Sequence, residues 1–145
     1  MTPIDLPTRA YVPGRTQRHP EGAFDHLRQT VVPGLSAAAL AQTAAFRAGL
    51  LFLEQGYDWE AHEVLEPVWM ACPDPSAERT LIQALIQLAN ASLKAKMERP
   101  KAKDRLLVIS ADLIGAAFAA DRIVMGLTQE DVIAKLRNLQ NNASG

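Results

Sequence analysis

The sequence predicts an all-α protein, and two observations carry this prediction. From Ser36 onward, apolar residues recur at helical spacing in segments that proline, glycine or capping residues separate. No stretch of strand length alternates apolar and polar residues, as a half-buried β-strand would. The 145 residues, 48% of them hydrophobic, are enough for one domain with a sizeable core. We therefore expect a single-domain bundle of about five helices over residues 36–140.

Residues 1–35 differ from the rest of the chain in composition. They hold five prolines and three glycines and show no helical period, which is typical of extended chain. Tyr11, Val12, Phe24 and Leu27 give this segment apolar anchors. We expect an extended, proline-rich N-terminal arm that packs on the bundle and contains a short helical turn over residues 24–30.

The five expected helices are bounded by capping and breaking residues. They span residues 36–55, 59–71, 76–98, 101–124 and 128–139. The side chains expected to cap helix starts are those of Ser36, Asp58, Ser76 and Thr128, the last in a capping box with Asp131. The helix over residues 76–98 has the broadest apolar face and should be the central one. Pro67 should kink the second helix and leave the Glu63 carbonyl free for another partner, or else divide it into two shorter helices.

Composition and charge exclude several classes of protein. The net charge of −1 argues against nucleic-acid binding, since such proteins are usually basic. The single cysteine, Cys72, excludes an internal disulfide framework. No apolar run approaches the roughly 20 residues that span a membrane, and the first residues contain no apolar signal-peptide core. A cytoplasmic protein is the expectation.

The charged residues are unevenly distributed. Residues 48–78 contain acidic side chains and no lysine or arginine, whereas basic side chains dominate residues 94–105. Two interpretations are open. The two regions neutralise each other in a compact bundle, or the acidic helix faces a cleft that takes a cation or a basic group.

The segment YDWEAHEVLEPVW, residues 57–69, is the most informative in the chain. Trp59, His62, Glu66 and Trp69 follow a 3-4-3 spacing that places them in one stripe of a helix, with Glu63 beside it. The next helix has a polar stripe that includes Gln83 and Gln87. The simplest arrangement packs the two helices so that His62 and Glu66 meet these amides. The candidate cluster comprises Trp59, His62, Glu63, Glu66, Trp69, Gln83 and Gln87.

Three interpretations of this cluster are open: a structural network of hydrogen bonds, a small-molecule pocket, or a divalent metal centre. His62 and Glu66 are the candidate metal ligands, but the segment lacks the second histidine of an HExxH motif, and a metal needs a third ligand. Either His19 or His26 could complete a site if the arm folds over this helix. The two tryptophans are more often core or interface anchors than cofactor clamps.

The residues WEAHEVLEPVW, followed by LIQALIQLANASLK, resemble the bacterial and archaeal family numbered 309 among domains of unknown function. The family's HExLExxW-like segment corresponds to residues 62–69, and its QxLIQxA-like helix to residues 83–89. The arm segment over residues 10–27 resembles the N-terminal extension of proteobacterial members. The resemblance implies a small helical bundle in which the HE helix packs on the glutamine helix. It implies no reaction.

Two classes of function follow. The protein is a non-enzymatic binding or assembly module that self-associates through an apolar face of its last two helices, or it is a metal-dependent, hydrolase-like enzyme. In the enzyme, Glu63 or Glu66 would act as a base while His62 orients it or binds metal. Whether the protein is an enzyme stays open at this point.

Overall fold

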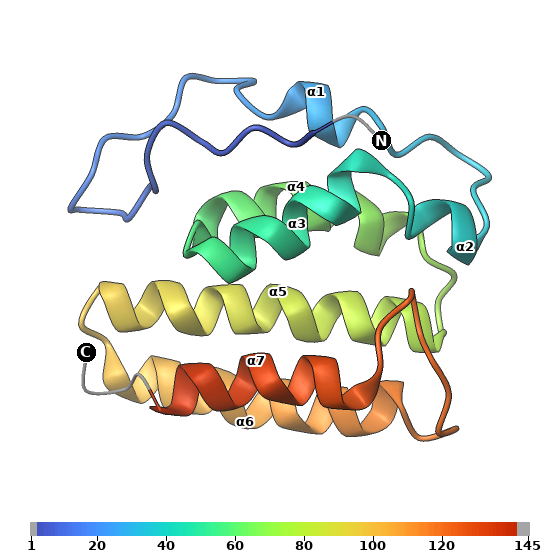
Figure 1. Ribbon diagram of the computed structural model, residues 1–145. Helices are drawn as coiled ribbons and strands as arrows, with labels where there is room; N and C mark the ends of the chain where they lie inside the picture. Colours follow the sequence, from blue (N-terminus) through green and yellow to red (C-terminus); the bar gives the residue numbers. More distant parts are fainter. Residues whose placement is uncertain (1–2, 142–145) are drawn as a thin grey trace.

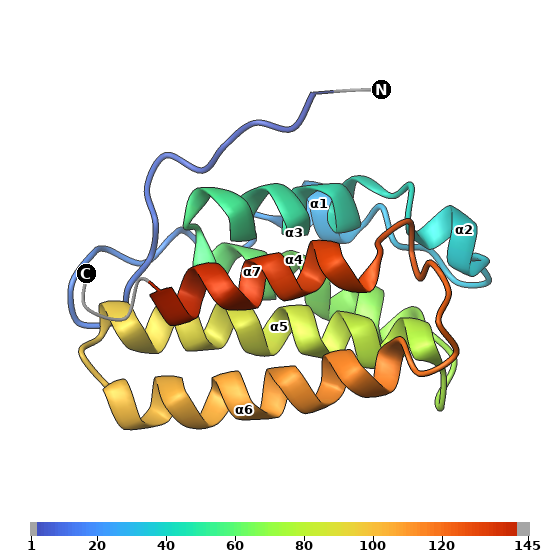
Figure 2. The same cartoon turned by 60° about the horizontal axis from the view of Figure 1, so that its bottom comes forward.

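The computed structural model describes residues 3–141 and shows an all-α chain (Figures 1 and 2). Its helices are α1 (Asp25–Arg28), α2 (Ala37–Leu40), α3 (Ala44–Gln55), α4 (Asp58–Ala71), α5 (Ala77–Lys96), α6 (Pro100–Ala117) and α7 (Gln129–Asn141). Among the described residues, the only β-structure is an isolated bridge between Val124 and Leu127; the remaining residues outside the helices are turns and extended chain. The prediction of an all-α bundle with five principal helices is confirmed.

The helices form layers around α5 (Figure 1). Helix α4 packs against α3 on one side and against α5 on the other, while α6 and α7 lie on the opposite side of α5. The N-terminal segment, residues 3–35, lies over α3 and α4 and places α1 against both of them. The site described below and helix α6 are therefore on opposite sides of the molecule.

The core is apolar and is centred on α5, as its sequence predicted. Leu81, Ile82, Leu85 and Leu88 of this helix are fully buried. Helices α3 and α4 approach closely at Gly49, because a Cβ atom built there would lie 2.3 Å from Leu65 Cδ2. No helix within residues 3–141 has the length and apolar character needed to cross a membrane.

The first expected helix, over residues 36–55, is in fact two helices. The hydroxyl of Thr43 accepts a hydrogen bond from the Phe46 N–H at 3.2 Å and so caps α3, after a short α2 that Ser36 caps. The Ala45 N–H donates to Thr30 Oγ1 of the N-terminal segment, at 3.1 Å. The single-helix prediction was wrong because a threonine side chain can replace the backbone partner of a helix N–H.

Of the other predicted helix boundaries, some are confirmed and others were wrong. Ser76 caps α5, and Thr128 and Asp131 form the predicted reciprocal capping box before α7, with bonds of 2.9 and 3.1 Å. The prediction that α6 reaches Val124 was wrong. The chain leaves the helix after Ala117, and Asp121, Met125 and Gly126 adopt positive φ angles in the connection to α7.

Asp58 does not cap α4, as had been expected. The cap residue is Tyr57, and Asp58 is the first helical residue. Its buried carboxylate pairs with Lys96 Nζ at 2.8 Å, which joins the start of α4 to the end of α5. Burial raises the pKa of Asp58, while hydrogen bonds from Lys96 and Ser92 oppose this shift.

Candidate functional site

The polar residues predicted on α4 lie mainly on the face that turns toward α1. His62 Nε2 is 3.4 Å from Glu66 Oε2, one helical turn further on, and the two side chains are 32% and 41% exposed. Arg28 of α1 lies between the carboxylates of Glu63 and Glu66, at 3.8 and 3.9 Å. The acidic face of α4 is therefore neutralised in part by the N-terminal segment.

Pro67 explains a second contact of Arg28. Proline has no N–H, so within the continuous helix α4 it leaves the Glu63 carbonyl without its normal helical donor. The guanidinium of Arg28 donates a hydrogen bond to this carbonyl. The expectation that the Glu63 carbonyl takes another partner is confirmed, and the division of α4 into two shorter helices was wrong. The kink at Pro67 stays a prediction.

Glu60 anchors the N-terminal segment to α4. Its side chain is fully buried, and its Oε2 atom accepts hydrogen bonds from the Tyr11 backbone N–H at 2.7 Å and from His19 Nε2 at 2.5 Å. Within the described residues, Glu60 Oε1 is buried without a hydrogen-bond partner. His19 thus does fold over α4, as one of the two arm histidines was considered to do, but it meets Glu60 rather than His62.

An aromatic cluster surrounds this anchor. The ring of Trp59 stacks on His19, with centroids 5.9 Å apart and an interplanar angle of 27°. Tyr11 meets the same indole edge-on at 5.3 Å, and Phe24 does so at 6.3 Å. These contacts fix the imidazole of His19 and the indole of Trp59 in place.

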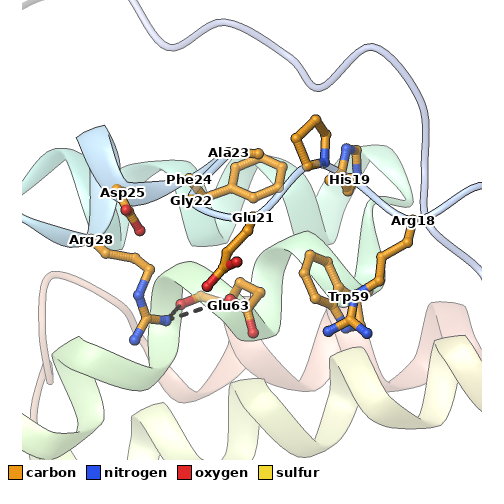
Figure 3. Close-up of a pocket in the computed structure, with 11 residues that line it drawn as sticks. Arg18, His19, Glu21, Gly22, Ala23, Phe24, Asp25, Arg28, Trp59 and Glu63 are labelled. Atoms are coloured by element: carbon orange, nitrogen blue, oxygen red, sulfur yellow. Dashed lines mark hydrogen bonds and ion pairs between the residues drawn. The ribbon is translucent and has the colours of Figure 1, made fainter.

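A pocket of about 630 Å³ opens between the N-terminal segment and α4 (Figure 3). Trp59 and Phe24 supply its apolar walls, and His19 lies at its edge. At one end, Figure 3 shows Arg18 beside Trp59; at the other, Glu21 and Asp25 lie near the Arg28–Glu63 pair. One end of the pocket is therefore basic and the other mainly acidic.

Only two members of the predicted cluster, Trp59 and Glu63, line this pocket. Trp69 lies further along α4, where the guanidinium of Arg79 sits 4.1 Å from its ring centroid. Gln87 accepts a hydrogen bond from Asn90 at 3.4 Å. Between residues 3 and 141, no hydrogen bond joins His62 or Glu66 to Gln83 or Gln87.

The reason is visible in the packing of α4 on α5. The two helices meet through apolar side chains, with Leu65 and Val68 of α4 in one cluster with Leu85 and Leu88 of α5. The two helices are neighbours, as predicted, but the predicted polar contact between them does not form.

Within residues 3–141, the two oppositely charged regions meet in only one ion pair, Asp58–Lys96. Other ion pairs involve residues from outside the two regions, such as Arg28 with Glu66 and Arg122 with Glu78. As for metal binding, the described part of the chain contains no group of three or more His, Cys, Asp or Glu side chains that could hold an ion. His62 and Glu66 have no third ligand of this kind beside them.

Sequence reasoning missed Glu60, Arg28 and Arg18 as residues of this site. The available signal was the composition of the N-terminal segment, in which arginine, histidine and aromatic residues alternate over residues 9–28. Such a segment is apolar enough to pack and polar enough to supply partners for the acidic helix.

The fold and the site define a small all-α bundle with a polar and aromatic pocket under its N-terminal segment. Residues 46–106 match the family model described as Domain of unknown function (DUF309), and the chain resembles this family as its motifs predicted. The match covers α4 and α5, whereas Arg18, His19, Phe24 and Arg28 lie outside it. Neither the curated proteins nor the solved structures gave a match.

Proposed function

We propose that this small helical-bundle protein is a small-molecule-binding module, and that its ligand is a small, amphoteric, aromatic compound. The observation that carries the proposal is the pocket of about 630 Å³ between the N-terminal segment and α4. This volume is within the usual range for ligand sites, roughly 300–1,000 Å³. Trp59 and Phe24 offer faces and edges on which a planar ring can pack.

The charges of the pocket support the amphoteric class of ligand. Arg18 stands at the end near Trp59, and no hydrogen bond or ion pair of its guanidinium occurs within residues 3–141. Glu21 and Asp25 at the other end are also exposed carboxylates without ion pairs in this part of the chain. A ligand with an acidic group toward Arg18 and a basic group toward Glu21 would satisfy both ends.

The buried Glu60–His19 pair supports a binding role for the N-terminal segment. Two hydrogen bonds to Glu60 hold residues 11 and 19 against α4, so the pocket exists before a ligand enters. A preformed site loses less conformational entropy on binding than a mobile segment would. In this proposal the His62–Glu66 pair and Arg28 serve mainly to hold the segment in place.

The metal-dependent, hydrolase-like alternative has less support. Glu63 and Glu66 are each paired with Arg28, which competes with a metal for their oxygens, and a third ligand is missing among the described residues. The sequence also leads us to expect a cytoplasmic location and a homo-oligomeric state. Both stay predictions.

The proposal is tested by titrating ¹⁵N-labelled protein with three related probes and recording ¹H–¹⁵N correlation spectra. The probes are 4-(aminomethyl)benzoate, which carries both charges, and benzoate and benzylammonium, which carry one each. We expect the zwitterion to shift the resonances of residues around Trp59 and Phe24 at the lowest concentration. Shifts that are absent for all three probes, or spread over the whole spectrum, would contradict the proposal.

Two variants and a control locate the binding site. Arg18→Gln and Glu21→Gln remove one exposed charge each from opposite ends of the pocket. Arg18→Gln should reduce the zwitterion's advantage over benzylammonium, and Glu21→Gln its advantage over benzoate. The matched control is Glu130→Gln, an exposed residue of α7 outside the pocket, which should leave all three titrations unchanged.

A further inference from the structure

We infer that α6 is a homodimer interface, and that two copies of the chain pair through this helix in antiparallel orientation. Helix α6 lies on the outside of the molecule, where α5 and α7 cover only part of it (Figure 2). Figure 1 places it on the side of α5 away from the pocket. The inference is therefore independent of ligand binding.

The exposed side of α6 carries a regular stripe. Its members follow a 4-3-4-3 spacing and are all exposed: Lys101, Arg105, Val108, Asp112 and Gly115. This spacing aligns the five residues along one face of the helix, where a second helix could meet them in a single seam. The central residue, Val108, is apolar, and charged residues stand on both sides of it.

Exposed apolar side chains occupy the middle of the stripe. Val108 is 63% exposed and Ile109 beside it is 39% exposed, which places them among the few large apolar residues on the described surface. Gly115 and Ala116 follow one to two turns later and are also exposed. A Cβ atom at Gly115 would meet nothing within 4 Å, so a second helix can approach this part of α6 closely.

The charges along the stripe favour a second α6 helix as the partner, in antiparallel orientation. Basic residues stand near the N-terminus of α6, which has no acidic residue in its first turn. Cations at a helix N-terminus are opposed by the helix dipole. In an antiparallel pair, Lys101 and Arg105 would instead lie toward the C-terminal half of the second helix and within reach of its Asp112.

A second copy of this chain fits these features better than an unrelated partner. A two-fold axis near Val108 and Ile109 repeats the Arg105–Asp112 contact on both sides of the apolar centre, so one surface is complementary to itself. A groove of about 410 Å³ runs beside the stripe, between Asp104, Val108 and Gln140 of α7.

Sedimentation equilibrium of the full chain over a range of concentrations tests the inference. The wild-type protein should show a monomer–dimer equilibrium. Val108→Lys should abolish the dimer, while Arg105→Glu and Asp112→Arg should each raise its dissociation constant about tenfold. The double variant Arg105→Glu/Asp112→Arg should restore much of the lost affinity, because it exchanges the two charges.

The changed side chains are exposed, so the folded state is checked by circular dichroism in each variant, and Glu130→Arg on α7 serves as a control that should dimerise normally. A wild-type chain that remains monomeric at the highest concentration would overturn the inference. So would a dimer that Val108→Lys leaves intact, or a double variant weaker than both single variants.

Discussion

Glu60 and His19 form a buried pair in which Glu60 Oε2 lies 2.5 Å from His19 Nε2, although 41 residues separate them in the chain. The same oxygen accepts the Tyr11 N–H. Through one carboxylate, α4 therefore holds two points of the N-terminal segment and fixes one wall of the pocket.

The packing of the N-terminal segment against α4 therefore depends on Glu60. Glu60→Ala leaves the part-buried Tyr11 N–H and the ring N–H of the buried His19 side chain without their partner. Each such loss costs about 1–3 kcal/mol, so the free energy of unfolding in urea should fall by that order. Trypsin should also cleave faster after Arg15 and Arg18. His26→Ala, an exposed change in the same segment, should alter neither measurement. Equal protease resistance in the Glu60→Ala protein would argue against the anchor.

The close approach of α3 and α4 gives a second prediction. Gly49→Ala places a methyl group 2.3 Å from Leu65 Cδ2, inside a fully buried contact. Overpacking of this kind typically costs about 1–3 kcal/mol, which thermal unfolding would detect as a lowered Tm. Gly115→Ala is the matched control, since its methyl group meets open space in the single chain; because Gly115 lies in the proposed dimer interface, both variants are compared at concentrations where the protein is monomeric. Its higher helix propensity should leave the Tm equal or raised.

Cys72 should be chemically inert in the folded protein. Its side chain is buried, and burial raises the pKa of the thiol to about 11. The reactive thiolate is therefore scarce at pH 8. We expect 5,5′-dithiobis(2-nitrobenzoate) to react with the native protein far more slowly than with the protein in urea. Equal rates in the two states would show that the thiol is accessible.

The capping box of α7 gives a pH dependence with a definite sign. Hydrogen bonds from the Thr128 backbone and side chain lower the pKa of Asp131 below its usual value of 3.8. A lowered pKa in the folded state means that the ionised group stabilises α7 above pH 3.8, and that this contribution is lost as the pH falls below that value toward the lowered pKa. Asp131→Asn should remove this part of the acid dependence, which unfolding curves at several pH values would reveal. An unchanged acid dependence in Asp131→Asn would exclude Asp131 as its source.

Most of the fold could be predicted from the sequence because its signals are local. The caps at Ser76 and Thr128 and the apolar face of α5 each specify structure within a few residues. The errors arose where a competing local interaction decided the outcome. Thr43 starts a new helix inside an apparently continuous pattern, and α6 ends at Ala117, ahead of a connection in which Asp121 and Met125 adopt positive φ angles.

The candidate site was predicted less well, because it depends on contacts between distant parts of the chain. The residues of the predicted stripe all lie on α4, but their spacing could not show which element would cover them. The sequence favoured the polar face of α5, whereas α4 meets α5 through apolar residues such as Leu65. The N-terminal segment covers the polar face instead, and Arg28 supplies the charge that the acidic helix lacks.

Fluorescence of Trp59 tests the central claim, a preformed pocket for an amphoteric ligand, most directly. In Trp69→Phe protein, Trp59 is the only remaining tryptophan and lies in the pocket wall. We predict that 4-(aminomethyl)benzoate changes its emission along a saturable curve, and that Arg18→Gln and Glu21→Gln each shift that curve to higher concentration. An emission that does not respond to the probe, or a curve that both variants leave in place, would contradict the account.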